Sequence, residues 1–163
     1  MKNTLSLKPI SACDAEPMLD ILTSKEVART YMLPDFESRE AALPLFHRLM
    51  DLSRQDSRFV RGIYLEDTLI GFLNDVESAN GTIELGYVIH PDHWGKGCMT
   101  EGLKLAINDL FRLGYQEVIC GAFSHNAASI RVMEKAGMTK INKVDLIEYR
   151  GKTHTCVYYS IQK

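Results

Sequence analysis

The chain has 163 residues, of which 45% are hydrophobic and 25% are charged. This length is that of a single domain with a sizeable core, so we expect residues 1–163 to form one unit. The formal net charge of −2 gives no overall positive field that would attract nucleic acid or an anionic membrane, so neither is expected as a partner.

The four cysteines, at positions 13, 98, 120 and 156, form no C-x-x-C pair and have no histidine at zinc-finger spacing. Scattered thiols of this kind are typical of reduced cysteines and indicate a cytoplasmic protein. The segment Met1–Lys8 is too polar for a secretory signal, and the sequence has no apolar run long enough to span a bilayer.

The first third of the chain predicts one strand and two helices. A short strand is expected over 4–8 and an amphipathic helix over 14–23, with Asp14 as a suitable N-cap. The segment 27–35 is ambiguous. A second helix is expected over 38–52, either beginning near Pro44 or bending there, because an interior proline removes a backbone hydrogen bond.

The middle of the chain predicts an antiparallel meander with strands over 59–64, 69–76 and 82–89. Asn80-Gly81 joins the last two strands, and this dipeptide is typical of a two-residue hairpin.

The remaining elements alternate between helix and strand. A helical stripe over 103–111 ends at Gly114, a strand covers 117–123, and a helix over 126–136 ends at Gly137. Two final strands are expected over 141–149 and 154–161, joined by a turn at 150–152. A meander followed by β-α-β predicts an α+β fold, a mixed sheet with helices packed on it.

A glycine loop, Trp94-Gly-Lys-Gly-Cys-Met-Thr100, lies between the strand over 82–89 and the following helix. It lacks the spacing of a Walker A loop and of the dinucleotide G-x-G-x-x-G pattern. A strand, a glycine loop and a helix start nevertheless place bare N–H groups at a helix N-terminus, where they can hold a phosphate.

At this point the chain resembles the Gcn5-related N-acetyltransferase (GNAT) superfamily, and within it the RimJ/RimL-like ribosomal-protein alanine N-acetyltransferases. The resemblance rests on Trp94-Gly-Lys-Gly-Cys-Met-Thr-Glu-Gly102 and on Asn126-Ala-Ala-Ser129 followed by Glu134-Lys-Ala-Gly137-Met138. It implies a central, mixed, mostly antiparallel twisted sheet of about seven strands with about four flanking helices, splayed between strands 4 and 5.

The resemblance also implies that acetyl-CoA is the co-substrate. No metal is expected, for a reason that the residues themselves give. His90, Asp92 and His93 lie in a proline turn without the spacing that would bring them together around an ion. The positions that match the family's coenzyme-binding residues are Val88, Ile89, Trp94, Gly95, Lys96, Gly97, Cys98, Met99, Thr100, Asn126 and Ser129.

Three positions of the loop region depart from the superfamily or group pattern. Trp94 stands where most of the superfamily has Arg or Gln, Met99 replaces a Gly or Ala, and Gly102 replaces an Ala. A methionine that points inward at position 99 would crowd the phosphate. Backbone amides bind whatever the side chain, so coenzyme binding is still expected.

Glu84 is the candidate general base, since an attacking amine has to give up a proton. It alternates with apolar residues on a strand that leads to the loop, where burial would raise its pKa. The alternative is an ordinary carboxylate that faces solvent.

Ser129 has two interpretations. With Asn126 as N-cap it is simply a polar residue of a first helical turn. By resemblance it lies near the sulfur of the coenzyme. Many GNAT enzymes carry a tyrosine that acts as general acid four residues further on, where this chain has Met133. The role of a hydroxyl group near the sulfur therefore falls to Ser129 or to no residue. Cys98 lacks the His and Asp partners of a nucleophile.

The sequence therefore predicts an acetyl-CoA-dependent N-acetyltransferase that acts on a primary amine by direct transfer in a ternary complex. A protein N-terminal α-amine is the acceptor that the resemblance favours. A small-molecule amine (a polyamine, an antibiotic or an amino-acid derivative) and a non-catalytic acyl-CoA-binding domain are the alternatives. The acceptor pocket is expected to draw on 25–54, and the protein is expected to be a monomer or a homodimer.

Overall fold

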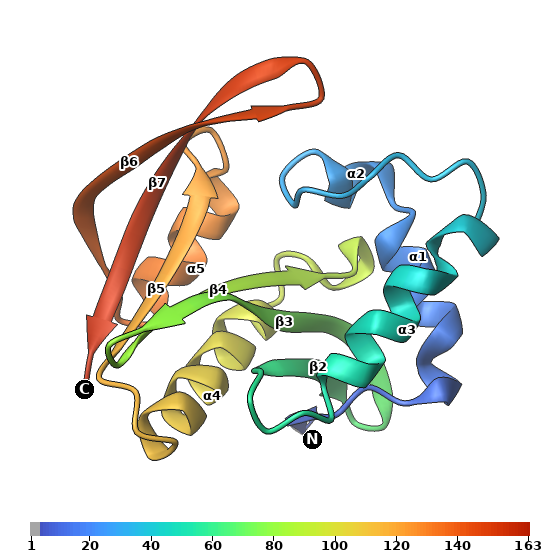
Figure 1. Ribbon diagram of the computed structural model, residues 1–163, viewed down its shortest axis with the longest axis horizontal. Coiled ribbons are helices and arrows are strands. Elements are labelled where there is room, and N and C mark those ends of the chain that lie inside the picture. Colours follow the sequence, from blue (N-terminus) through green and yellow to red (C-terminus); the bar gives the residue numbers. More distant parts are fainter. Residues whose placement is uncertain (1–3) are drawn as a thin grey trace.

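The computed structural model describes residues 4–163, which contain a seven-stranded sheet in the order β1-β2-β3-β4-β5-β7-β6 (Figure 1). Neighbouring strands are antiparallel except for the parallel pair β4 and β5, which confirms the predicted mixed sheet. The strands are β1 (Leu5–Lys8), β2 (Val60–Leu65), β3 (Thr68–Ala79), β4 (Thr82–Ile89), β5 (Glu117–Phe123), β6 (Thr139–Tyr149) and β7 (Lys152–Gln162).

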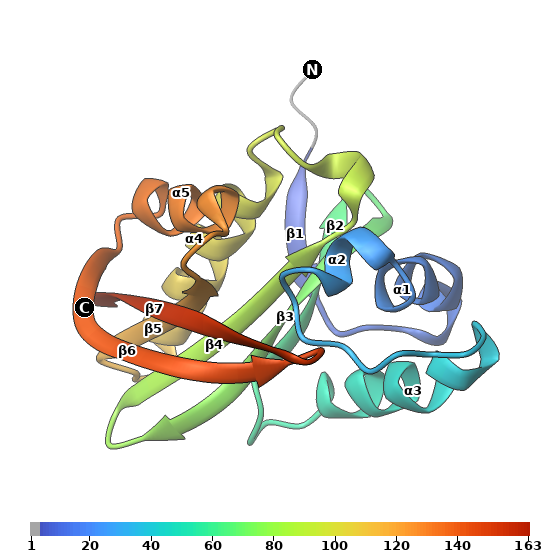
Figure 2. The same cartoon turned by 90° about the horizontal axis from the view of Figure 1, so that it is seen from above.

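Helices cover both faces of the sheet (Figure 2). Helices α4 and α5 pack on one face, and α1 and α3 pack on the other with the short α2 beside them. Alternation along β4 divides its side chains between the two cores, so that Leu85 packs under α4 and Val88 under α1 and α3. The helices are α1 (Ala15–Leu22), α2 (Lys25–Ala28), α3 (Leu43–Leu52), α4 (Cys98–Arg112) and α5 (Ala127–Lys135).

The sheet opens between β4 and β5, as predicted. These strands pair only over Thr82–Leu85 and Glu117–Cys120. Beyond that point β4 stays with β3 as far as Ile89, and β5 stays with β7 as far as Phe123 (Figure 1). The backbone of β4 after Leu85 therefore has strand partners on one side only, and we call this region the β4–β5 opening.

Several predicted elements have different bounds in the structure, and two of these differences have a clear physical reason. Regular helix begins only at Leu43, because Pro44 lies in the first turn, where a missing N–H removes no intrahelical bond. Strand β3 runs past the predicted residue 76 to Ala79, since the Asn80-Gly81 hairpin keeps Ala79 paired with Thr82.

A fifth α-helix within residues 4–163 was not predicted. Helix α2 is a single turn capped by Ser24, whose Oγ accepts from the Val27 N–H at 3.2 Å. Four residues are too few to show a helical repeat. None of the helices in this described part of the chain has the length and hydropathy needed to cross a bilayer.

The β6–β7 hairpin reaches across the molecule to the N-terminal helices (Figure 1). Its tip is the predicted turn, with Arg150 and Gly151 both at positive φ. The Tyr149 hydroxyl donates to the Ala28 carbonyl at 2.6 Å, and Arg150 forms an ion pair with Asp35. The hairpin tip is therefore bonded to α2 and to the segment that follows it.

Candidate functional site

The glycine loop between β4 and α4 presents a row of backbone N–H groups. Gly95 and Gly97 have φ of 74° and 79°, and Gly97 is the N-cap of α4 without any side-chain cap. Within residues 4–163, no acceptor is hydrogen bonded to the amides of 95–100. Such amides at a helix N-terminus are suited to an anion such as a phosphate.

Met99 does not crowd this loop. Its side chain is buried in the core, and its methyl group lies 3.5 Å from where a Cβ on Gly102 would be. This is an ordinary van der Waals distance, so Met99 fits beside position 102 without crowding. The side chains nearer the loop differ in exposure, with Lys96 exposed and Cys98 and Thr100 half-buried.

Trp94 fastens the loop to the end of β4. Its indole Nε1–H donates to the Ile89 carbonyl at 2.9 Å, while 47% of the residue stays exposed. At this position, where the resemblance would place Arg or Gln in most of the superfamily, Trp94 acts as a backbone anchor.

Of the two β4 positions expected at the cofactor, only Ile89 turns its amide to the β4–β5 opening. The His90 N–H donates to Ile70 of β3 at 2.7 Å, and consecutive N–H groups along a strand alternate in direction. The Ile89 N–H therefore points away from β3, toward the opening. Val88 is paired in register with Phe72, and its side chain is buried under α1 and α3.

Glu84 lies on the α1–α3 face of the sheet, at the start of the opening. Its side chain is 16% exposed, so it is not the solvent-facing carboxylate of the alternative interpretation. Burial raises its pKa most, the nearby Lys143 lowers it, and Glu77 and Asp145 raise it. The net effect is a raised pKa, which makes this carboxylate a better proton acceptor than an exposed one.

Ser129 lies on the opposite face, where α5 begins. Asn126 caps this helix, its Oδ1 accepting from the Ser129 N–H at 3.2 Å. The Ser129 Oγ lies 2.6 Å from the Tyr87 hydroxyl. Tyr87 is three residues beyond Glu84 on β4, and this odd spacing turns the two side chains to opposite faces.

Tyr87 was not among the predicted site residues. Burial raises the pKa of its phenol, so the hydroxyl stays protonated at physiological pH. In the sequence it is one more large residue of an apolar strand, and nothing local identifies its partner on α5. Met133, by contrast, is fully buried in the core and brings no polar group to the site.

The two predicted catalytic residues are therefore not in contact. Glu84 and the Tyr87–Ser129 pair lie on opposite faces of the sheet, on either side of the β4–β5 opening. A group held in the opening can be reached by a base from one face and by a hydroxyl donor from the other.

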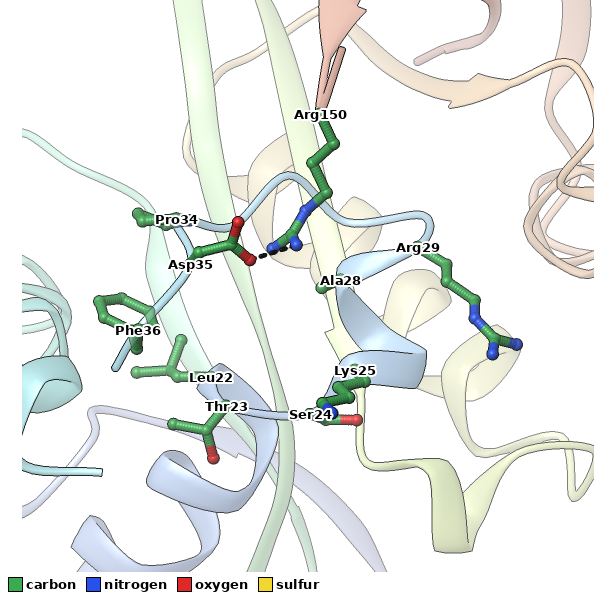
Figure 3. Close-up of a pocket in the computed structure, with 10 residues that line it drawn as sticks. All are labelled: Leu22, Thr23, Ser24, Lys25, Ala28, Arg29, Pro34, Asp35, Phe36 and Arg150. Carbon is green, nitrogen blue, oxygen red and sulfur yellow. Dashed lines mark hydrogen bonds and ion pairs between the residues drawn. The ribbon is translucent and has the colours of Figure 1, made fainter. Parts of the chain in front are cut away.

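Two cavities adjoin the N-terminal helices, and each is lined partly by the segment 25–54 that was predicted to form the acceptor pocket. One, of about 430 Å³, lies between α2 and the hairpin tip, where Arg150 and Asp35 point toward each other (Figure 3). The other, of about 300 Å³, lies on the sheet face that carries Glu84 and reaches Asn74 and Asp75 of the adjacent β3. Its wall is mainly apolar, with contributions from Tyr31 and Leu49.

Comparison with a family model and with a curated relative points to the same class of protein. Residues 4–139 match the family model described as an acetyltransferase (GNAT) domain. The chain is 31% identical to an uncharacterized N-acetyltransferase, YoaA of Bacillus subtilis, over 98% of this chain and 93% of that protein.

Two solved structures share the fold at low sequence identity. RimL, a ribosomal L7/L12 α-N-protein acetyltransferase, superimposes with a TM-score of 0.85 at 16% identity, over 99% of this chain and 92% of its own. A spermidine N-acetyltransferase from Vibrio cholerae gives a TM-score of 0.79 at 16% identity, over 97% of this chain and 95% of its own.

Proposed function

Because the chain belongs to the GNAT family of N-acetyltransferases, we propose that it transfers the acetyl group of acetyl-CoA directly to a protein N-terminal α-amine. The observation that carries the proposal is the β4–β5 opening with unpaired loop amides at its end and a half-buried carboxylate at its start. We further propose that residues 1–163 act as one domain, as a monomer or a homodimer.

Two segments of the chain would hold the pyrophosphate and the pantetheine arm of acetyl-CoA. The amides of 95–100 would hold the pyrophosphate, with Lys96 adding a charge-assisted contact. The pantetheine arm would lie in the β4–β5 opening, beside Asn126 and Ser129 at the start of α5. The bound coenzyme supplies an activated thioester.

Ile89 would stabilise the oxygen of the thioester carbonyl. Its N–H points into the opening and would donate to that oxygen as negative charge develops on it. The Trp94 bond to the Ile89 carbonyl, in the next peptide group, holds the end of β4 and the glycine loop in a fixed relation. Much of the rate would come from this positioning of the two reactants.

Glu84 would take the proton of the attacking amine, directly or through a water molecule. An amine attacks only when neutral, and it becomes acidic as it bonds to the carbonyl carbon. The raised pKa of Glu84 brings its proton affinity nearer to that of a base that works at neutral pH.

The Tyr87–Ser129 pair would assist departure of the thiolate. Ser129 would donate a hydrogen bond to the leaving sulfur, while the Tyr87 hydroxyl donates to Ser129 and sets its orientation. The raised pKa of Tyr87 makes it a donor that keeps its proton, so a water molecule would protonate the thiolate later.

A small-molecule amine is the second candidate acceptor, and one observation favours it. The β6–β7 hairpin is bonded to the segment after α2 through Tyr149 and Arg150, and so narrows the approach to the acceptor face from that side. The cavity of about 300 Å³ beside β3 would accommodate a small amine with an apolar body.

The experiment is an assay of thiol release from acetyl-CoA with two panels of acceptors. One panel holds short peptides with free N-termini, and the other holds polyamines, aminoglycosides and amino acids. Turnover with peptides alone supports the proposal, and turnover with small amines alone supports the second candidate. No thiol release with either panel, while coenzyme A still binds, would contradict both candidate functions.

A further inference from the structure

We propose that Lys143 is an internal competitor for the acceptor: its ammonium occupies the amine subsite beside Glu84 and has to leave before the acceptor amine binds. The inference rests on the proposed function, in which Glu84 receives the acceptor's proton. It makes Lys143 a residue that sets how tightly a cationic acceptor is bound.

A bulge in β6 places Lys143 opposite Tyr158. Lys140 is paired with Tyr159 of β7, and the next registered pair is Val144 with Val157. The chain thus advances four residues on β6 and two on β7, which leaves 141–143 opposite Tyr158 alone. Bulges of this kind re-aim side chains and are frequent beside active sites.

The Lys143 ammonium lies in surroundings that suit an amine. Its Nζ is 3.8 Å from Glu84 Oε1 and 4.3 Å from the centre of the Tyr158 ring. The Tyr158 hydroxyl donates to Asp145 Oδ2 at 2.7 Å, which holds a second carboxylate nearby. One carboxylate, one aromatic face and a neighbouring acidic group would bind the ammonium of an acceptor as they bind this one.

The ion pair between Lys143 and Glu84 is weak enough for an acceptor to displace Lys143. Its side chain is 40% exposed, and the 3.8 Å separation is an ion pair without a hydrogen bond. Two ammonium groups cannot share the subsite, because like charges at contact distance repel. An acceptor therefore binds only by displacing Lys143 into solvent.

Displacement also affects the base. Lys143 lowers the pKa of Glu84, whereas burial and the other charged groups raise it. The titratable groups that face Glu84 from the packed elements are Glu77 on β3, Lys143 and Asp145 on β6, and Cys156 and Tyr158 on β7. Cys120 of β5 interacts with Glu84 from the opposite face of the sheet. Lys143 is the cation among these groups, so its displacement removes the charge that lowers the pKa of Glu84.

The test compares Lys143→Met with Lys140→Met, an exposed lysine on the same strand before the bulge. The Glu84 carboxyl is followed by ¹³C NMR and assigned by its loss in Glu84→Gln. n-Butylammonium chloride is the probe, with sodium chloride at equal ionic strength as the control. We expect Lys143→Met to bind the probe about fivefold more tightly than wild type and to raise the pKa of Glu84, and Lys140→Met to match wild type.

Kinetics add a second readout, with alanyl-alanyl-alanine amide and spermidine as acceptors. We expect Lys143→Met to lower KM for whichever amine turns over while kcat changes less, and Lys143→Arg to restore the wild-type KM. Unchanged or weaker binding of the probe, together with an unchanged or higher KM, in Lys143→Met would overturn the proposal. If no acceptor in either panel turns over, the proposed function fails, but the NMR result still decides the role of Lys143.

Discussion

The hydroxyl groups of Tyr87 and Ser129 lie 2.6 Å apart and join β4 to the first turn of α5 at the β4–β5 opening. This contact connects the strand that carries Glu84 to the helix that carries the second polar group of the site. It also places a phenol where the sequence indicated only a serine.

Replacing Tyr87 with Phe removes the hydroxyl that orients Ser129 and keeps the ring. We expect kcat to fall about fivefold, the ratio that corresponds to one hydrogen bond of about 1 kcal/mol, with the KM for acetyl-CoA nearly unchanged. Ser129→Ala should give a loss at least as large, and the double variant should lose no more than Ser129→Ala alone. Additive losses in steady-state kinetics would show that the two hydroxyl groups act separately.

Glu84→Gln keeps the shape of the side chain and removes the base. We expect kcat to fall about 100-fold while the affinity for acetyl-CoA is retained. In wild type the active form is the carboxylate, so kcat/KM should rise with pH through the raised pKa of Glu84, and this limb should be absent from the variant. A wild-type kcat in Glu84→Gln across the pH range would exclude the base role.

Stability should also depend on the ionisation of Glu84. Because the folded-state pKa is raised above the unfolded value, the protonated group contributes stability below the unfolded pKa, and that contribution is lost as pH rises through the folded pKa. Urea unfolding should therefore show wild type weakening relative to Glu84→Gln over this interval. Parallel curves for the two proteins would contradict the burial argument.

The two kinds of glycine around the loop should respond oppositely to alanine. Gly97 has a φ of 79°, so Gly97→Ala strains the loop by about 1 kcal/mol or more and should weaken coenzyme A binding in calorimetry. Gly102 lies inside α4, where an added Cβ would meet its neighbours at ordinary van der Waals distances, so Gly102→Ala should raise the free energy of unfolding by up to about 1 kcal/mol. The conformational explanation would be refuted if Gly97→Ala bound coenzyme A as tightly as wild type, or if Gly102→Ala lowered the free energy of unfolding.

Trp94→Phe removes the indole N–H that binds the Ile89 carbonyl and keeps an aromatic ring. We expect the KM for acetyl-CoA to rise about fivefold, since one hydrogen bond of about 1 kcal/mol no longer fixes the loop to β4. Unchanged KM and kcat would show that the loop keeps its position without this anchor.

The elements that were predicted well are those with local patterns. The strand over 82–89 and the strand over 117–123 agree with the structure because alternation, a hairpin dipeptide and a glycine stop are all read within a few residues. The glycine loop was recognised for the same reason. Helix α2 was missed because a single capped turn leaves no repeat to detect.

The contacts of the site depend on register between distant segments, and sequence alone does not determine it. Tyr87 meets Ser129 across 42 residues of chain, and Lys143 reaches Glu84 from the β6 bulge that lies opposite Tyr158. No local pattern marks that bulge, and a one-residue change of register would turn Lys143 to the other face.

Amine-dependent thiol release from acetyl-CoA, followed in wild type and in Glu84→Gln with mass spectrometry of the acceptor, is the decisive measurement for the proposed acetyl transfer. We predict one thiol released for each acetylated amine in wild type, and loss of most of that rate in Glu84→Gln with coenzyme A affinity retained. Thiol release without an acetylated amine, or equal rates in the two proteins, would contradict the proposed transfer.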